Sequence, residues 1–471
     1  MKEKVLIILT AIVLVALAAM PITACLQYLN TSADKPDFEG FYYNVENGQV
    51  VITNYRGDSE HVVVPETIEG MPVVKIKAWT FDDVDIVSVT IPNSVVEVAY
   101  SAFFRCEKLQ TIVLGENTVT ALNARIVVGC NSMNYNKYDN GYYIGTSTNP
   151  YYLLVEAESE ETTSISIHPD TKYVGYRAME ECSQLVSVEI PTGVLAMGGY
   201  VFDGCTNLQY VYIPESVQQI GYRVFDECES LANIEVRPEN QSYKSENNCL
   251  FTKDGKTLIR YFTDQPNSVC IVPEGTNRID TYAFSCVRNL VEVVIPNSVE
   301  IIDGGAFYSC YDLQKVTVGN NVQDIDADTF SLCESLVEID MPGVEFIDSY
   351  SFYKCTSLKR IGWSESLKTI YDQAFYQCES LEEVVIPNSV TGIWDNAFWK
   401  CTNLKRVVIG SSVDYIGCYV FRECSSLQEV SFVDAQGWKV GVVFYRKIDV
   451  SDAQQNAKYF LDKHRAKIWQ K

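Results

Sequence analysis

Apolar residues recur along this chain at intervals of 22 or 23 residues. Residues 374–381 read Ala-Phe-Tyr-Gln-Cys-Glu-Ser-Leu, and 23 residues later residues 397–404 read Ala-Phe-Trp-Lys-Cys-Thr-Asn-Leu. The complete unit is A-F-x-x-C-x-x-L-x-x-V-x-I-P-x-S-V-x-x-I-x-x. A fixed period of this size predicts a solenoid, in which each repeat buries its apolar face only against its neighbours.

Each repeat contains two short apolar segments. In one copy, Leu208, Val211 and Ile213 predict a strand, which ends at Pro214 because proline fixes φ and lacks an N–H donor. A second segment around Ile220 returns the chain toward the next repeat. We therefore expect a β-rich solenoid of the α+β class, built from leucine-rich repeats of about 23 residues with stacked short parallel strands.

The repeat array is predicted to span residues 81–430, with insertions at about 131–175 and 238–280. The first insertion is rich in tyrosine, and the second has two apolar runs on either side of Asp254-Gly255. An Asp-Gly pair between apolar runs predicts a β-hairpin. The repeat returns to phase after each insertion, so we interpret both as enlarged repeats with β extensions.

The two ends of the array are expected to be caps, because a terminal repeat has no neighbour on one side. Residues 37–80 predict a β-rich N-terminal cap, and residues 431–471 a C-terminal cap. Ser451 is followed three residues later by Gln454, which is typical of a capping box. Apolar residues at helical spacing then predict a helix over residues 452–468.

The N-terminus has the pattern of a targeting segment. Lys2 and Lys4 precede residues 5–20, which are all apolar except Thr10. A run of this length is short for a membrane span and suits the core of a signal peptide, which we place at residues 1–24. Export is therefore expected.

Cys25 ends the sequence Ile-Thr-Ala-Cys, which is similar to the box of bacterial lipoproteins. We expect lipidation of Cys25 as the mature N-terminus, followed by a tether over residues 25–36, so that the protein is held on the outer face of the membrane. Ordinary cleavage after Ala24 and an uncleaved anchor remain open as alternatives.

Composition narrows the range of functions. The 471 residues are 47% apolar and 21% charged, which provides ample material for a continuous core. The formal net charge of −24 argues against nucleic acid as a partner, because phosphate binding requires clustered Lys and Arg. The acidity is otherwise explained by the solubility of a long exposed surface.

Eleven of the sixteen cysteines occupy one position of the repeat, and we call this set the thiol ladder. Stacked repeats would point these side chains inward in parallel, a geometry that suits disulfide torsions poorly. Free cysteine packs well as a small apolar residue, so we favour reduced core thiols over a disulfide framework, and the spacing lacks the pairs typical of zinc sites. The members are Cys106, Cys182, Cys205, Cys228, Cys286, Cys310, Cys333, Cys355, Cys378, Cys401 and Cys424.

No motif for catalysis accompanies the repeats. The three histidines, His61, His168 and His464, lie in the leader, in an insertion and in the terminal helix, and no nucleophile elbow, phosphate loop or HExxH motif is present. We therefore expect neither an enzyme nor a cofactor.

The alternating Asp324, Asp326 and Asp328 suggest calcium ligands at first sight. They lack the glycine and the downstream glutamate of a calcium loop, so exposed side chains are the favoured interpretation and no metal is expected.

The most defined candidate for binding is the outward side of the Leu-x-x-Val-x-Ile strands. The residues two and four after each Leu point away from the core, because side chains alternate along a strand. Tyrosine offers a large contact area and arginine a forked donor, both common at interfaces, although a periodic stripe also serves to stack repeats. The candidate site residues are Tyr210, Tyr212, Asn233, Glu235, Glu338, Asp340, Arg360 and Arg406.

These units resemble the BspA-type (treponemal-type) leucine-rich repeats of bacterial cell-surface proteins. The resemblance covers about residues 40–430 and rests on a specific motif that recurs in at least ten copies, with departures such as Val127 and Met179 in Phe positions. It implies a role in cell-surface adhesion, including the binding of host matrix proteins.

Taken together, the residues and the resemblance predict an exported, lipid-anchored, adhesin-like solenoid that binds a protein or a glycan. The alternative is a structural or assembly component of the cell envelope with no dedicated ligand.

Overall fold

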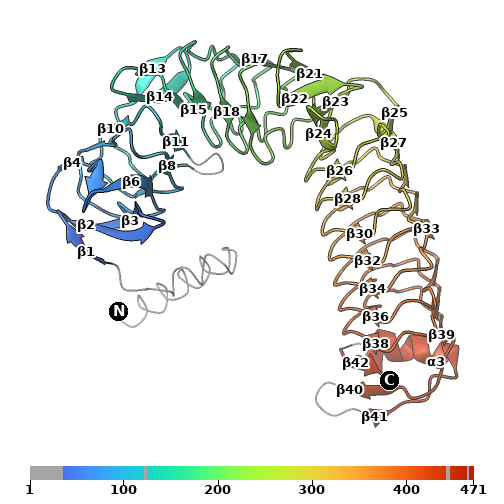
Figure 1. The fold of residues 1–471 in the computed structure, drawn as a ribbon. Helices are drawn as coiled ribbons and strands as arrows, with labels where there is room; N and C mark the ends of the chain where they lie inside the picture. The colour runs from blue at the N-terminus through green and yellow to red at the C-terminus, as the bar shows by residue number, and fades with distance from the viewer. Residues whose placement is uncertain (1–34, 121–124, 442–445, 464–465) are drawn as a thin grey trace. The chain divides into compact units, whose positions relative to one another are not determined.

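The computed structural model describes residues 35–120, 125–441, 446–463 and 466–471. These residues form two compact units, the first ending at Asn134 and the second running from Tyr135 to Lys471. Both units consist of short strands stacked in parallel ladders (Figure 1). No helix in the described ranges is long and apolar enough to span a membrane. The predicted solenoid of leucine-rich repeats is confirmed by these ladders.

The first unit opens with an antiparallel meander that feeds the repeats. β1 (Lys35–Phe38), β2 (Phe41–Glu46) and β3 (Gln49–Tyr55) pair in order, and β3 then pairs in parallel with a strand of the first repeat. The ladders therefore begin before residue 81, the start expected from the sequence. One ladder holds β6 (Met71–Ile76), β8 (Glu97–Val98) and β11 (Val119–Thr120), with β5 (Thr67–Ile68) beside β6. A second ladder holds β4 (His61–Val63), β7 (Ser88–Thr90) and β10 (Thr111–Leu114). A third ladder holds β9 (Phe103–Phe104) and β12 (Val127–Val128).

In the second unit, the Leu-x-x-Val-x-Ile segments form one side of the solenoid, which we call the strand face. Its strands fall into three parallel sheets, interrupted after β21 and after β33. They are β17 (Ser187–Glu189), β19 (Tyr210–Ile213) and β21 (Asn233–Val236); then β25 (Ser268–Ile271), β27 (Leu290–Val294), β29 (Lys315–Thr317), β31 (Glu338–Asp340) and β33 (Arg360–Gly362); then β35 (Glu383–Val385), β37 (Arg406–Ile409) and β39 (Glu429–Phe432).

The second apolar segment of each repeat forms the return ladder. Both insertions extend it, because β15 and β24 pair antiparallel with their own hairpin partners and parallel with the next repeat. The predicted Asp-Gly hairpin is confirmed as β23 and β24. The strands are β13 (Asn136–Tyr138), β14 (Gly141–Thr146), β15 (Leu153–Ala157), β16 (Tyr173–Val174), β18 (Ala196–Met197) and β20 (Gln219–Ile220); β22 (Tyr243–Glu246), β23 (Cys249–Thr252), β24 (Thr257–Tyr261), β26 (Arg278–Ile279) and β28 (Ile301–Ile302); and β30 (Asp324–Ile325), β32 (Phe346–Ile347), β34 (Thr369–Ile370), β36 (Gly392–Ile393) and β38 (Tyr415–Ile416).

The core between the ladders is a set of columns of identical side chains. The repeat phenylalanines stack face to face, with ring centroids 4.9 Å apart for Phe352 and Phe375 and 5.2 Å apart for Phe375 and Phe398. The expected burial is confirmed at one repeat by Leu208 and Val211, which have no exposed surface. Each column buries apolar side-chain surface, and this burial is the main contribution to the stability of such an array.

The thiol ladder is buried throughout, as the repeat pattern predicts. Its thiols also have a polar role that the sequence does not indicate. Cys378 Sγ lies 3.2 Å from the carbonyl oxygen of Phe352, and Cys401 Sγ lies 3.3 Å from that of Phe375. A thiol is a weak donor, so each of these two cysteines links its own repeat to the backbone of the one before.

The turns between the columns require an unusual backbone conformation. The residue before ten of the eleven ladder cysteines has a positive φ, for example 62° at Gln377, 61° at Lys400 and 61° at Glu423, and at the remaining one Cys286 itself has a φ of 55°. Positive φ is costly for a residue with a Cβ atom. Packing on both sides of the turn maintains this conformation, although Gly204 is the one glycine among these positions.

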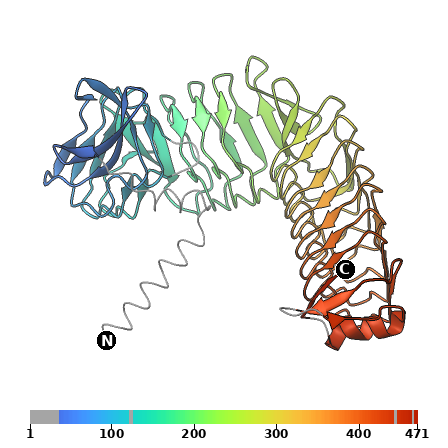
Figure 2. The ribbon, with the colours of Figure 1, turned by 60° about the horizontal axis from the view of Figure 1, so that its bottom comes forward.

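The C-terminal cap differs from its prediction. α3 (Ala453–Lys458) continues into the π-helical turn η1 (Tyr459–Lys463), and β42 (Ile468–Gln470) follows, so a helix over 452–468 is too long. β42 pairs with β38 and with β40 (Lys439–Gly441), which also pairs with β41 (Arg446–Lys447), and this pairing covers the open end of the return ladder (Figure 2). The fully buried Trp469 explains why the chain extends at this point. The helix is capped by Asp452 rather than Ser451.

Candidate functional site

Four of the candidate site residues lie together on the strand face. In the parallel register, Tyr210 lies beside Asn233, and Tyr212 lies beside Glu235. Glu189, on the preceding strand, continues the row of Tyr212. Adjacent strands of one sheet therefore place two tyrosines and two carboxylates on one surface, which is what alternation along the strands predicts.

A hydrogen bond fixes one of these tyrosines. The Tyr210 hydroxyl donates to Oε2 of Glu235 at 2.8 Å, and both tyrosine side chains are half-buried. Burial, this bond and the nearby carboxylates raise the pKa of Tyr210 to about 12. The hydroxyl stays protonated at neutral pH, so Tyr210 is a donor held in place by Glu235.

The other four candidate residues lie on the two other sheets of the strand face. Glu338 and Asp340 belong to β31, Arg360 to β33 and Arg406 to β37. Arg360 forms an ion pair with Glu338 of the neighbouring repeat. The partners lie 22 residues apart, which is one repeat, so they are direct neighbours in the parallel register.

Arg406 is also engaged within the array. Its Nε lies 2.9 Å from Oε1 of Glu383 on the adjacent strand. Pairs of this kind between exposed side chains contribute little stability each. They do occupy the forked donors that a ligand would need, so Arg360 and Arg406 serve the stacking of repeats in this structure.

The second insertion contacts the end of β21, where the Val236 amide donates to Ser245 Oγ at 3.1 Å. Its hairpin joins the return ladder and not the strand face. The insertion therefore does not extend the row of Tyr210 and Tyr212. Asn240, at the start of the insertion, is fully buried. Its Nδ2 donates to the carbonyl oxygens of Pro214 and Val217, and its Oδ1 accepts from the amides of Ser242 and Tyr243. Asn240 therefore anchors the insertion and is not a contact residue.

A buried polar network joins the repeats on either side of this insertion. Arg223 Nε donates to Oδ2 of Asp226 at 2.7 Å, and the Ser285 hydroxyl donates to Oδ1 at 2.6 Å. Arg260, which is only 3% exposed, donates through one terminal nitrogen to Ser285 Oγ and to the carbonyl oxygen of Tyr282, each at 3.1 Å. The residues are far apart in sequence, and no local pattern marks them.

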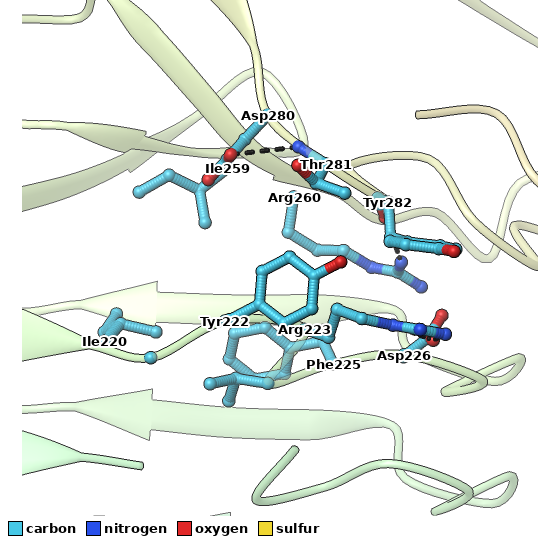
Figure 3. Close-up of a pocket in the computed structure, with 12 residues that line it drawn as sticks. Ile220, Tyr222, Arg223, Phe225, Asp226, Ile259, Arg260, Asp280, Thr281 and Tyr282 are labelled. Carbon is cyan, nitrogen blue, oxygen red and sulfur yellow. Dashed lines mark hydrogen bonds and ion pairs between the residues drawn. The ribbon is translucent and has the colours of Figure 1, made fainter. Parts of the chain in front are cut away.

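The same network lines a pocket of about 30 Å³ (Figure 3). A volume of this size is enough to admit water. Burial and the charge of Asp226 raise the pKa of the neighbouring Asp203 to about 7. Among the residues that the structure describes, no three His, Cys, Asp or Glu side chains are grouped as metal ligands.

The described histidines do not form a catalytic arrangement. His61 Nδ1 lies 2.8 Å from Ser88 Oγ between two exposed neighbouring strands, and His168 stacks on Tyr151 with ring centroids 3.9 Å apart. A nucleophile needs a base that is itself oriented by a third group, usually within a pocket. An exposed pair on a ladder does not meet that requirement. His464 and Cys25 lie outside the described residues.

Comparison with known proteins gives a family but no ligand. The model of the BspA type leucine rich repeat region, which has six copies, matches residues 60–148, 157–254, 260–348 and 345–437. No curated protein sequence matches the chain.

Several solved structures are similar in fold. A leucine-rich repeat protein from Bacteroides ovatus ATCC 8483 is 22% identical, with a TM-score of 0.44, over 84% of this chain and 94% of that one. A leucine rich cell surface protein from Faecalibacterium prausnitzii A2-165 is 22% identical, with a TM-score of 0.35, over 86% and 97%. The pneumococcal vaccine antigen PcpA is 17% identical, with a TM-score of 0.37, over 84% and 87%. These likenesses say nothing about what this chain binds.

Proposed function

Because the chain belongs to the family of BspA-type leucine-rich-repeat proteins, we propose that it is an exported, lipid-anchored surface protein that binds a protein or glycan through its strand face. Proteins of this family are typically surface-associated, and leucine-rich repeats generally serve interaction rather than catalysis. A solenoid provides an extended surface for that purpose, because each repeat adds one strand to the same face.

The observation that carries this proposal is the tyrosine surface of β19 and β21. Tyr210 and Tyr212 present ring area at low entropic cost, since tyrosine has only two flexible torsions and Tyr210 is already held by Glu235. Exposed Asn233 and Glu235 beside them supply polar groups that would orient a partner. The site is therefore preorganised in the free protein, which lowers the cost of binding.

The anchoring part of the proposal rests on the sequence. Residues 1–24 would be removed as a signal peptide, lipidated Cys25 would become the N-terminus, and residues 25–36 would tether the solenoid. Mass spectrometry of the membrane fraction tests this directly: an unmodified Cys25 or a soluble mature form would rule out the lipid anchor and leave export standing.

The binding part is tested with the mature protein on panels of immobilised matrix proteins and glycans. We expect a bound partner to be lost or weakened at least about tenfold in the Tyr210→Ala/Tyr212→Ala variant, as expected for a hot spot of this kind. Val385→Ala on β35 is the matched control, because Val385 is an exposed strand-face residue of another sheet. Equal binding by the double variant and the control would rule out this surface.

A structural role without a dedicated ligand is favoured by one observation. The ion pairs of Arg360 with Glu338 and of Arg406 with Glu383 link neighbouring repeats across the strand face, which supports this second function. If no panel member binds the native protein, and crosslinking on cells recovers only envelope components, this second function is the correct one.

A further inference from the structure

β25 has an open edge in the middle of the strand face. It is the first strand of its sheet and pairs only with β27. β21, the strand before it on this face, ends a different sheet, and within the described residues no backbone hydrogen bond joins β21 to β25. Figure 1 shows β25 at the point where the second insertion returns to the array.

The interruption has a physical cause. On the turn side, the repeat of Asp226 is bonded directly to the repeat of Ser285, and Glu229 pairs with Arg288 at 2.8 Å. Residues 59 apart are therefore neighbours there, although the strand face holds the additional strand β25 between their repeats. Because the extra strand lies on one side of the solenoid and has no counterpart on the other, the sheet on that side is not continuous.

The open edge presents backbone groups. The amides of Ser268 and Val272 donate toward β27, to the carbonyl oxygens of Asn289 and Val294. In a strand the N–H and C=O groups of successive residues alternate between its two edges. The N–H and C=O groups of Val269 and Ile271 consequently point away from β27, where none of the described backbone groups pairs with them.

The side chains on this edge are apolar and accessible. Val269 is 51% exposed and Ile271 is 70% exposed. Proteins usually protect an open edge with lysine, proline, a bulge or a covering segment. β25 has a register shift between Ser268 and Val269, but residues 268–271 read Ser-Val-Cys-Ile and contain neither lysine nor proline.

The charges around the edge indicate what would cover it. Exposed Asp264 and Glu274 flank the strand, and Glu292, whose Oε1 lies 3.4 Å from Lys315 Nζ, lies beside Val269 in the register of β27. A second copy of this chain would bring the same carboxylates together, and its net charge of −24 would add to the repulsion. A segment with basic ends would instead be attracted.

We propose that the free edge of β25 binds an extended peptide segment of a partner protein, with aliphatic residues on alternate positions and basic residues at its ends. The segment adds a strand beside β25, and its aliphatic side chains pack on Val269 and Ile271. This is β-strand addition, in which main-chain hydrogen bonds supply affinity and alternate side chains supply specificity. The site is separate from the surface of Tyr210 and Tyr212, and the inference goes beyond the function proposed above.

The test uses the mature protein and the fluorescent peptide Lys-Val-Thr-Val-Thr-Val-Lys, with fluorescence anisotropy as the measurement. Two further peptides carry N-methyl groups on one or the other set of alternate residues. Pairing with an edge predicts that one methylated peptide binds at least about tenfold more weakly, while the other retains most of its affinity, because only one set of amides faces β25. Equal affinity of the two methylated peptides would overturn strand addition.

Variants locate the site. Ile271→Lys should weaken binding of the basic peptide at least about tenfold, through lost apolar contact and added repulsion. Val337→Lys is the control, because Val337 is a 37% exposed aliphatic residue within the continuous part of the array. The Tyr210→Ala/Tyr212→Ala variant should bind the peptide as the native protein does, so failure here and failure of the proposed function are distinguishable.

Two results would refute the assignment. One is equal loss of binding in Ile271→Lys and Val337→Lys, which would indicate a general charge effect. The other is a dimer in sedimentation velocity that Ile271→Lys dissociates, which would make a second copy of the chain the occupant. Circular dichroism of each variant verifies that the solenoid is intact.

Discussion

Asn240 offers the sharpest test of how the second insertion is held. Its side chain is 0% exposed and makes hydrogen bonds of 2.8 and 2.9 Å to two carbonyl oxygens and of 2.8 Å to each of two amides. Asn240→Ala removes all four bonds and leaves a small void. The variant therefore deprives two donors and two acceptors of their partner at a single position.

The magnitude follows from these four bonds. A hydrogen bond contributes about 1 kcal/mol net, and a buried group left without a partner costs about 1–3 kcal/mol. The Pro214 carbonyl retains a long bond from the Val217 amide, and Ser242 and Tyr243 are half-buried, so water reaches part of the site. We expect a loss of about 3–5 kcal/mol in the free energy of unfolding of this region.

Asn240→Asp keeps the acceptor for the two amides and removes the donor to the two carbonyl oxygens. The remaining oxygen still accepts from the two amides, but the second oxygen now faces two carbonyl oxygens in a buried position. This raises the pKa of the new carboxyl above its value of about 4 in the unfolded chain. Stability relative to the native protein should then be greatest at low pH and decline as pH rises above about 4.

The assay is urea unfolding followed by circular dichroism, combined with hydrogen exchange across residues 236–261. Gln241→Ala is the matched control, because Gln241 is exposed and bonds only to the carbonyl of Glu239. Exchange should accelerate in this segment first, since solenoids open locally. A loss in Asn240→Ala within about 0.5 kcal/mol of the control, or an Asp variant that gains stability with pH, would refute the reasoning.

Three further predictions concern single side chains. Cys401→Ser should cost only about 1 kcal/mol in urea unfolding, because the hydroxyl can donate to the carbonyl of Phe375 as the thiol does; a loss above about 3 kcal/mol would contradict that bond. Asp203→Asn should stabilise the protein progressively as pH rises from about 4 to 8, since the raised pKa of Asp203 makes its ionisation unfavourable to folding; an identical Tm difference at pH 4 and pH 8 would contradict this. Asp452→Ala should destabilise the C-terminal cap by about 1 kcal/mol, because Asp452 accepts from the amides of Gln454 and Gln455, and unchanged exchange of those amides would count against the cap.

Repetition explains why the architecture is readable from sequence. Positions such as Leu208, Phe375 and Cys401 recur in equivalent surroundings, so each copy supports the interpretation of the others. The orientation of Tyr210 and Tyr212 follows in the same way, since it depends only on alternation along a strand.

What occurs once is not readable in that manner. The network of Arg223, Asp226 and Ser285 joins residues up to 59 apart, and no local pattern specifies such contacts. The terminal helix is predicted too long because Ile468 suits the helical spacing equally well, whereas its place in β42, beside Gly441 of β40, depends on tertiary pairing. Long-range packing decides these features.

The thiol ladder makes the local opening of each repeat detectable by chemical modification of its cysteine. Burial raises the pKa of Cys182 to about 11 and that of Cys286 to about 12, so the reactive thiolate is scarce while the repeats are closed. A repeat that opens transiently exposes its own cysteine to any oxidant or alkylating reagent in the surrounding solution. Once modified, that thiol no longer fits between its neighbours, and the opening becomes permanent. Damage would therefore accumulate first in the repeats that open most often, and the pattern of modified cysteines would report the stability of the array repeat by repeat.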